Sequence, residues 1–388
     1  MALRITRTAA AALRRGHPWV YREAILRGRQ RAPETGETVE LTDEEGDFLG
    51  RGLYDASSPI AVRVFDATRG PALSATDLGA RVARAIARRD GRFDAETTAY
   101  RLCNGEGDRV PGMVIDRYGE VAVLRLDTDA WEPHLAGVAR AIVKPLAQRG
   151  VRSIGVRVAG EGKKLTPMEG PPPPDRVLVR EHGMAMEVDL SFGQKTGAFL
   201  DQRENRARVR ALAQGKKRVL NLFSYAGGFS LAAALGGAAR VTSVDVAAAA
   251  HATAQRSFRA NGIDPGAHAF VSADVFAFLD KARASGERFD LIISDPPSFA
   301  PSERALPRAI QAYRKLHGAV ASVLEEGGVL CASSCSSHVD AEAFAATLDD
   351  AALGRSDLRL CDLFGQPEDH PSLPAWPEGR YLKFAVLA

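Results

Sequence analysis

Strand-like and helix-like segments alternate from Arg218 to the end of the chain, and this alternation restricts the fold more than any other feature of the sequence. Short apolar, strand-like runs occupy residues 218–223, 240–246, 268–271, 289–294, 329–334, 358–364 and 380–387. Helical patterns separate the first six of these runs. The rhythm predicts an α/β fold, a doubly wound sheet with right-handed crossovers. Ligands bind such a sheet at the carboxyl ends of its strands, so the residues that follow each strand are the candidates for a binding site.

The 388 residues are too many for one ordinary domain, and their patterns divide them into three. Residues 1–70 contain short β-rich runs between Gly, Pro and Asp turns, as in a small all-β barrel. Residues 75–185 mix strand-like runs with helices predicted at 77–92 and 133–148, which indicates a small α+β middle domain. Its four prolines from Pro171 to Pro174 predict an exposed loop. Residues 190–388 form the doubly wound domain.

Charge is distributed unevenly, although the formal net charge is only +3. Residues 1–31 carry eight arginines and one glutamate, while residues 32–70 carry three arginines and nine acids. On the helix predicted at 77–92, arginines follow one another at steps of three or four residues: Arg81, Arg84, Arg88 and Arg92. Such a row suits RNA binding through the phosphate backbone, and a solvated helix face explains it about as well.

The sequence predicts no membrane span, secretory signal or metal site. No apolar run reaches the roughly 18 to 20 residues that a membrane helix needs, and the N-terminus lacks a continuous hydrophobic segment. The four cysteines show no C-x-x-C spacing. Cys331 and Cys335, on one strand, would lie about 13 Å apart, too far for a disulfide. Reduced thiols and a cytoplasmic location are therefore expected.

A glycine turn after the first strand of the alternating region indicates where a cofactor binds. The segment from Asn221 reads N-L-F-S-Y-A-G-G-F, and Gly227 and Gly228 would let a ligand approach the backbone. The turn is not G-x-G-x-x-G, which disfavours a dinucleotide. Asp245 ends the second strand and suits ribose hydroxyls, and Asp274 follows the third and suits an adenine amino group. Ribose and adenine without phosphate favour S-adenosylmethionine (SAM), although each acid could instead be a helix N-cap.

The next two strands end in groups that can take part in chemistry. Asp295 ends the fourth strand, and the two prolines after it stiffen the loop and leave bare carbonyls suited to a planar base. Cys335 ends the fifth strand among polar residues, and the helix after it is a candidate cause of a lowered thiol pKa. Cysteines on strands are more often inert core thiols, and this is the expectation for Cys103, Cys331 and Cys361.

A thiolate at position 335 would make methylation of carbon 5 of cytosine possible. That carbon is too weak a nucleophile to take a methyl group directly, but addition of a thiolate to carbon 6 turns it into an enamine-like nucleophile. Asp295 would hold or protonate N3 of the ring, and loss of the C5 proton would then expel Cys335. The base that removes this proton is not evident. A base within folded RNA must be splayed out to enter such a pocket.

These segments resemble, in order, motifs of the bacterial large-subunit (23S) ribosomal RNA methyltransferase I family, which are SAM-dependent cytosine-C5 methyltransferases with an N-terminal PUA domain. The resemblance runs nearly end to end and is most specific at residues 193–206, G-Q-K-T-G-A-F-L-D-Q-R-E-N-R. Before it come G-H-P-W-V-Y (16–21), G-R-G-L-Y-D (50–55) and N-G-E-G-D-R-V-P-G-M-V-I-D-R-Y-G (104–119). After it come N-L-F-S-Y-A-G-G-F, S-V-D, S-D-P-P-S-F, S-S-C-S, D-H-P and P-E-G-R-Y-L-K.

The resemblance implies a class I (Rossmann-like) SAM methyltransferase sheet preceded by a PUA β-barrel, with 23S ribosomal RNA as partner. It makes Cys335 the nucleophile and Asp295 the contact to the base. It also implies that Phe199, Asp201, Gln202 and Arg203 enclose the cofactor or shape the site. The residues implied to bind the cofactor are Phe199, Asp201, Arg203, Ser224, Gly227, Gly228, Phe229, Asp245, Asp274 and Asp295. Position 298 is Ser, so the second cysteine that some cytosine methyltransferases carry beside D-P-P is absent. A homodimer would widen an RNA-binding surface, although the sequence requires none.

Three other functions stay open on the residues alone. An N-methyltransferase would use the D-P-P loop to hold an exocyclic amine, with Cys335 as a bystander. A methyltransferase acting on a small molecule or a protein would need no RNA, but the separate β-rich region and the arginine row argue against it. A non-catalytic RNA-binding module would not bind SAM, and the intact acids Asp245, Asp274 and Asp295 argue against that.

Overall fold

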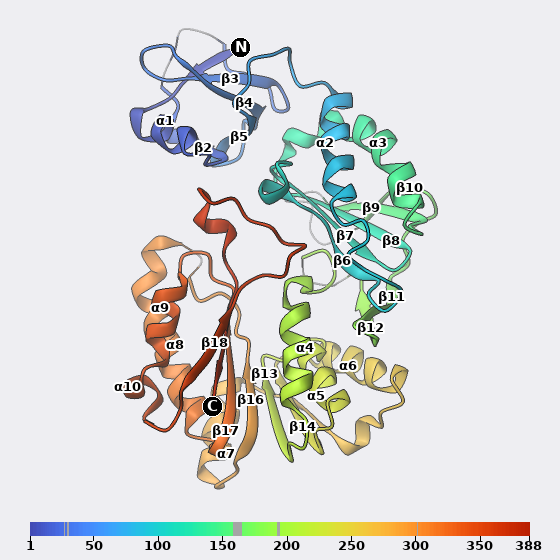
Figure 1. The fold of residues 1–388 in the computed structure, drawn as a ribbon, viewed down its shortest axis with the longest axis vertical. Coiled ribbons are helices and arrows are strands. Elements are labelled where there is room, and N and C mark those ends of the chain that lie inside the picture. Colours follow the sequence, from blue (N-terminus) through green and yellow to red (C-terminus); the bar gives the residue numbers. More distant parts are fainter. Residues whose placement is uncertain (27, 29–30, 158–164, 192–194, 301) are drawn as a thin grey trace. The chain divides into compact units, whose positions relative to one another are not determined.

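The computed structural model describes residues 1–388 except 27, 29–30, 158–164, 192–194 and 301 (Figure 1). Positions 193 and 194 of the most specific motif therefore lie outside the described residues. The chain divides into two compact units. The first consists of Met1–Val179, Val188–Leu200 and Glu368–Gly379, and the second of Arg180–Glu187, Asp201–Pro367 and Arg380–Ala388.

The N-terminal part of the first unit is a curled five-stranded sheet with the order β1-β3-β4-β5-β2. Its strands are β1 (Ala2–Arg4), β2 (Trp19–Tyr21), β3 (Thr38–Thr42), β4 (Phe48–Tyr54) and β5 (Ile60–Asp66). The expectation of an all-β region missed helix α1 (Arg7–Arg14). Four consecutive alanines favour a helix there, and the Thr6 hydroxyl accepts a hydrogen bond from Ala9 N as its N-cap. Ala10 and Leu13 of α1 join the core of this sheet.

The middle part of the first unit is a second five-stranded sheet, with the order β10-β9-β8-β7-β6. Its strands are β6 (Ala99–Asn104), β7 (Met113–Tyr118), β8 (Val121–Leu126), β9 (Ser153–Arg157) and β10 (Thr166–Glu169). Helices α2 (Ala75–Ala87) and α3 (Leu135–Ala147) pack together, which confirms the α+β character of this region. They can approach closely because a Cβ on Gly79 would lie 2.6 Å from Ala141 Cβ. Pro171–Pro174 is a loop, mostly exposed, as expected.

Helix α2 is shorter than the sequence pattern predicted, and this breaks the arginine row. The helix ends at Ala87 with Arg88 as its C-cap, and Gly91 then takes a left-handed backbone conformation (φ +71°). Arg81 and Arg84 thus lie on the helix, Arg88 lies at its end, and Arg92 lies in the turn beyond it. The prediction that four arginines share one helical face was wrong.

The second unit contains a seven-stranded sheet with the order β15-β14-β13-β16-β17-β19-β18. Its strands are β13 (Arg218–Leu222), β14 (Arg240–Asp245), β15 (Ala269–Ser272), β16 (Phe289–Ser294), β17 (Leu324–Ser334), β18 (Leu360–Phe364) and β19 (Lys383–Leu387). All are parallel except β19, which pairs antiparallel with both neighbours. The predicted doubly wound sheet is confirmed. Strands β11 (Arg176–Glu181) and β12 (Met184–Asp189) form a separate hairpin that is divided between the two units.

Helices cover both faces of the seven-stranded sheet (Figure 1). They are α4 (Arg203–Leu212), α5 (Gly228–Leu235), α6 (Ala248–Ala260), α7 (Val275–Ala284), α8 (Leu306–Ala321), α9 (Ala341–Ala345) and α10 (Asp350–Leu353). Strand residues alternate between two hydrophobic clusters: Leu220 and Ile292 pack with α7 and α8, whereas Val219 and Ile293 pack with α4 and α5. Because both faces are buried, the strands read as continuous apolar runs in the sequence.

Candidate active site

Three neighbouring strands of the second unit bring the predicted reactive segments to one edge of the sheet. Strand β16 lies between β13 and β17, with Leu222 opposite Ser294 and Ser294 opposite Ala332. The order of the strands reverses at β13, which is where ligands bind in sheets of this type. The glycine turn, Asp295 and Cys335 each come directly after one of these three parallel strands. The expectation that they share a crevice edge is therefore supported by the strand order.

The turn between β13 and α5 has an unusual backbone. Phe223 (φ +56°) and Tyr225 (φ +45°) take left-handed conformations, which residues other than glycine rarely adopt. Gly227 (φ +75°) is also left-handed. A Cβ on Gly227 would lie 2.6 Å from Ala254 Cβ, so only glycine fits. Such conformations cost free energy and concentrate at ligand sites. The buried Ser224 hydroxyl has no hydrogen-bond partner among the described residues, which leaves it available to a ligand.

The two acids expected to hold the cofactor differ in their present roles. Asp245 holds the glycine turn itself, because its carboxylate accepts hydrogen bonds from Tyr225 N at 2.8 Å and Ala247 N at 2.9 Å. Asp274 is exposed and accepts from Ala277 N at 3.0 Å as the N-cap of α7. The capping interpretation is thus correct for Asp274. Both acids stand at the carboxyl ends of adjacent strands, since β14 pairs with β15 up to Asp245 opposite Ser272.

Gln202 ties together the ends of β16 and β17. Its side-chain amide donates to Asp295 Oδ1 at 3.1 Å and to Ser333 Oγ at 3.0 Å. The amide is fixed in turn by Asn205, whose Nδ2 donates to Gln202 Oε1 at 2.6 Å. Gln202 and Asn205 are buried, whereas Asp295 is half-buried. The Asp295 carboxylate is therefore held in one orientation while part of it faces outward.

Other residues of the motif at 193–206 pack against the glycine turn. Arg206 forms two hydrogen bonds of 2.7 and 2.6 Å with the buried Glu181 carboxylate, and its Cδ would lie 2.9 Å from a Cβ on Gly228. Burial opposes the charge of Arg206, but Glu181 outweighs it and raises the Arg206 pKa. Asp201 accepts a hydrogen bond of 2.7 Å from the Tyr381 hydroxyl. The segment thus packs on the glycine turn and reaches the start of the last strand.

Hydroxyl groups hold the turn that carries Cys335. The buried Tyr313 hydroxyl lies 2.9 Å from Ser334 Oγ and 3.1 Å from Ser336 Oγ. Ser336 Oγ also lies 2.9 Å from Ser298 Oγ, in the loop after the two prolines. The Cys335 turn and the D-P-P loop are thereby linked. Cys335 itself is half-buried.

Known proteins similar to this chain bear on this geometry. The S-adenosylmethionine-dependent methyltransferase family model matches residues 168–377, and a PUA-like domain model matches residues 3–67. A ribosomal RNA large subunit methyltransferase from Deinococcus radiodurans is 41% identical over 100% of this chain and 97% of its own. Ribosomal RNA large subunit methyltransferase I from Klebsiella pneumoniae is 37% identical over 96% and 94%.

The chain belongs to the S-adenosylmethionine-dependent methyltransferases of the ribosomal RNA large subunit methyltransferase I family. A solved methyltransferase, SMU.776, complexed with SAH, is similar to it over 100% of this chain and 99% of the other (TM-score 0.88, 27% identity). So is a SAM-dependent methyltransferase from Streptococcus mutans (TM-score 0.87, 27% identity). These findings confirm the PUA-like N-terminal domain, the Rossmann-like sheet and SAM as the cofactor. The site fits SAM, because it offers an unpartnered buried hydroxyl, a closely approachable glycine backbone and two carboxylates at adjacent strand ends.

One residue of this methyltransferase site was missed by the sequence analysis. Lys383 begins β19 opposite Ser334, and its buried Nζ donates to Ser336 O at 2.5 Å and to Tyr381 O at 2.7 Å. Burial lowers its pKa to about 8, and the neighbouring Cys335 acts in the opposite direction. The charge beside Cys335 thus comes from Lys383. The helix that was expected to supply it, α9, begins only at Ala341. The signal was the family motif P-E-G-R-Y-L-K, in which this lysine is the last residue.

The other predicted residues fall elsewhere. Cys331 and Cys103 are fully buried, which raises both thiol pKa values, that of Cys331 to about 12. Cys361 is exposed, so the expectation of a core thiol was wrong there. Phe199 belongs to the first unit, where Lys195 Nζ lies 4.6 Å from its ring centroid, and its role in cofactor binding stays a prediction.

In the part of the chain that the structure describes, no helix is long and apolar enough to span a membrane. Within the same residues, no group of three or more His, Cys, Asp or Glu side chains is placed to hold a metal ion.

Proposed function

We propose that this protein transfers the methyl group of SAM to carbon 5 of a cytosine in 23S ribosomal RNA, with Cys335 as the nucleophile. The names of its relatives support ribosomal RNA of the large subunit as the substrate class. The observation that carries the cysteine mechanism is the pairing of two half-buried groups, Cys335 and Asp295, at neighbouring strand ends joined by Ser298 and Ser336. Ribosomal RNA as substrate implies a cytoplasmic enzyme.

The proposed reaction divides the work between these two side chains. The Cys335 thiolate adds to carbon 6 of the ring, and the electron pair of the C5–C6 bond moves toward C5 and N3. Asp295, oriented by Gln202, holds or protonates N3 and so offsets the charge of the adduct. When bound, SAM would supply the methyl group to C5 and leave as S-adenosylhomocysteine. Transfer of the C5 proton to a base restores the C5–C6 double bond and releases the Cys335 thiolate, and N3 returns to Asp295 any proton that it received.

Lys383 supports the first step in this proposal. With a pKa of about 8 it is mostly an ammonium group at neutral pH, and a positive charge beside a thiol favours the thiolate. Its bonds to two backbone carbonyls hold that charge in place. Lys383 therefore prepares the nucleophile at the pH at which the enzyme works.

The proposal also assigns the cofactor-binding residues. Ser224, Gly227, Gly228 and Phe229 would line SAM at the glycine turn, Asp245 would hold the ribose hydroxyls and Asp274 the adenine amino group. Asp201, Arg203 and Phe199 would enclose it. The support is the unpartnered Ser224 hydroxyl and the positions of the two acids at adjacent strand ends.

The test compares three proteins on unmodified 23S ribosomal RNA with labelled SAM: wild type, Cys335→Ala, and Cys331→Ala as the matched cysteine control. We expect 5-methylcytidine, identified by mass, from wild type and Cys331→Ala, and a loss of at least about 10³-fold for Cys335→Ala with SAM binding retained. A methylated amine, or a Cys335→Ala enzyme that keeps pace, would show that the D-P-P loop alone carries the chemistry. If no variant labels the RNA, a ribosomal particle and then small molecules are the next substrates.

A further inference from the structure

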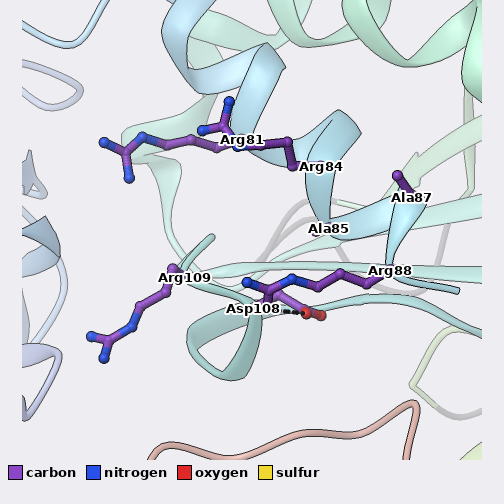
Figure 2. A pocket seen from close by; sticks show the side chains of 7 residues that line it. All are labelled: Arg81, Arg84, Ala85, Ala87, Arg88, Asp108 and Arg109. Atoms are coloured by element: carbon purple, nitrogen blue, oxygen red, sulfur yellow. Dashed lines mark hydrogen bonds and ion pairs between the residues drawn. The ribbon is translucent and has the colours of Figure 1, made fainter.

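We propose that a surface hollow in the first unit binds the phosphodiester backbone of the RNA, through Arg84, Arg88 and Arg109. The inference rests on the proposed RNA substrate and names where part of it docks. The hollow, which we call the arginine hollow, has a volume of about 420 Å³. It is lined by residues of α2 and of the turn before β7: Arg81, Arg84, Ala85, Ala87, Arg88, Asp108 and Arg109 (Figure 2).

The charges of the arginine hollow are only partly neutralised within the protein. Arg84 and Arg109 are exposed, and neither forms an ion pair with any described residue. Arg88 lies 3.3 Å from Asp108, but that carboxylate is already bound by Arg89 at 2.8 Å and by Asn104 N at 2.7 Å. Four arginines against one aspartate give the lining a formal charge of +3. An anion is therefore the ligand that this surface attracts.

Two of the four arginines first predicted to bind RNA do not belong to this ligand set. Arg81 is paired with Asp66, which also binds Arg51 at 2.9 Å. Arg92 lies beyond the end of α2 and is paired with Glu368. Their charges are satisfied within the first unit. Arg109, which the sequence pattern did not single out because it is far from α2 in the chain, takes their place.

The residues beneath the arginine hollow are held by several hydrogen bonds, whereas Arg84, Arg88 and Arg109 are exposed. Arg89 is buried and donates to Asp108 Oδ1, to Arg101 O at 3.0 Å and to Ala85 O at 3.2 Å. Arg109 has a left-handed backbone (φ +59°), and its N–H donates to Glu106 O at 3.0 Å. In Figure 2 the side chains of Arg84, Arg88 and Arg109 extend to the same side. Fixed backbones thus present three guanidinium groups to one region of solvent.

This arrangement fits a run of phosphates better than a single small anion. A site for one phosphate usually has several donors that converge on it, whereas here the exposed groups come from two separate segments. Contacts of this kind position a nucleic acid and release counterions without reading its sequence. We therefore assign the arginine hollow to positioning of the RNA backbone, a role separate from the chemistry at the reacting base.

The experiment measures binding of unmodified 23S ribosomal RNA to wild type and to the triple variant R84Q/R88Q/R109Q across a series of salt concentrations. Gln keeps much of the side chain, and Asp108 keeps Arg89 and Asn104 as partners, so the fold should persist. We expect affinity at 0.15 M salt to fall at least about fivefold. The slope of log K against log salt should become less steep by about 2 to 3, near 0.7 to 0.9 for each lost contact. Arg140→Gln removes an exposed arginine of α3 that lines no part of the hollow, and serves as the matched control.

Three results would overturn the inference. One is a triple variant with unchanged affinity and slope while the wild type still methylates the RNA, which would leave the proposed function standing. Another is a loss of affinity in the triple variant that only equals the loss in Arg140→Gln, which would assign the effect to general charge. A loss that is the same at every salt concentration would likewise overturn it, because it would assign the effect to folding. A wild type that methylates no RNA in any form would instead contradict the proposed function, and SAM binding by all variants separates these cases.

Discussion

The reaction centre of the second unit and the arginine hollow of the first unit hold their functional groups in opposite ways. At the reaction centre, Gln202 and Lys383 are each 3% exposed, and each side chain donates to two fixed acceptors. In the arginine hollow, Arg84 and Arg109 are exposed and form no ion pair with the described residues. Chemistry at one carbon atom requires fixed positions, whereas a repeating backbone of phosphates requires charge. Substitutions that keep charge but change geometry should therefore separate the two.

Among substitutions that leave Cys335 and Asp295 in place, the largest effect should come from breaking the geometry around Asp295. Gln202→Leu deletes the donor to Asp295 Oδ1 and Ser333 Oγ, so the carboxylate loses its orientation. We expect kcat for methylation to fall on the order of 10²-fold with SAM affinity nearly unchanged. Asn205→Ala, which only frees the Gln202 amide, should cost less. Single-turnover kinetics with calorimetric SAM titration makes the measurement, and an equal loss of SAM affinity would show that Gln202 serves the cofactor instead.

A smaller effect should follow from removing the charge of Lys383. Below pH 8 the ammonium group of Lys383 favours the Cys335 thiolate. This favourable effect is lost as the pH rises through the Lys383 pKa of about 8, because the amine then loses its charge. Lys383→Met should therefore raise the thiol pKa of Cys335, because it removes the neighbouring positive charge. The rate of alkylation of Cys335 by iodoacetamide should fall most at pH 6 to 7 and converge with wild type above pH 9. An alkylation profile that does not move would mean that Lys383 acts only through its hydrogen bonds.

Lys383→Arg tests geometry against charge at the same position. The larger guanidinium keeps the charge but cannot occupy the buried place between Ser336 O and Tyr381 O, so activity should not be restored. Full activity of Lys383→Arg would place the reaction centre in the same class as the arginine hollow.

The smallest effect should come from exchanging arginine for lysine in the arginine hollow. The double variant Arg84→Lys, Arg109→Lys keeps both charges, so RNA affinity at 0.15 M salt should change by less than about twofold, with the salt slope unchanged. Filter binding against wild type measures it. A loss as large as that of the glutamine variant would show that paired hydrogen bonds to single phosphates, which lysine cannot make, decide the affinity.

The sequence predicted the positions of Asp295 and Cys335 in the fold better than the arrangement of the four arginines. Asp295 and Cys335 each directly follow a strand, and apolar runs in the sequence predict these strands. Both residues could therefore be placed at one edge of the sheet from the sequence. The arginine row depended on where α2 ends, and the helix stops at Ala87. Helix α1 could have been predicted, because its four alanines have high helix propensity and Thr6 precedes it as an N-cap.

The sequence by itself determined the family, the cofactor, the doubly wound sheet and the order in which its strand ends present Gly227, Asp295 and Cys335, because motifs and apolar runs are properties of neighbouring residues. Only the tertiary structure showed that Gln202 orients Asp295 and that Lys383 stands beside Cys335. Only the tertiary structure showed that Arg109 lines the same hollow as Arg84 and Arg88. These contacts join residues far apart in the chain, and burial and charge depend on what packs around a side chain in space.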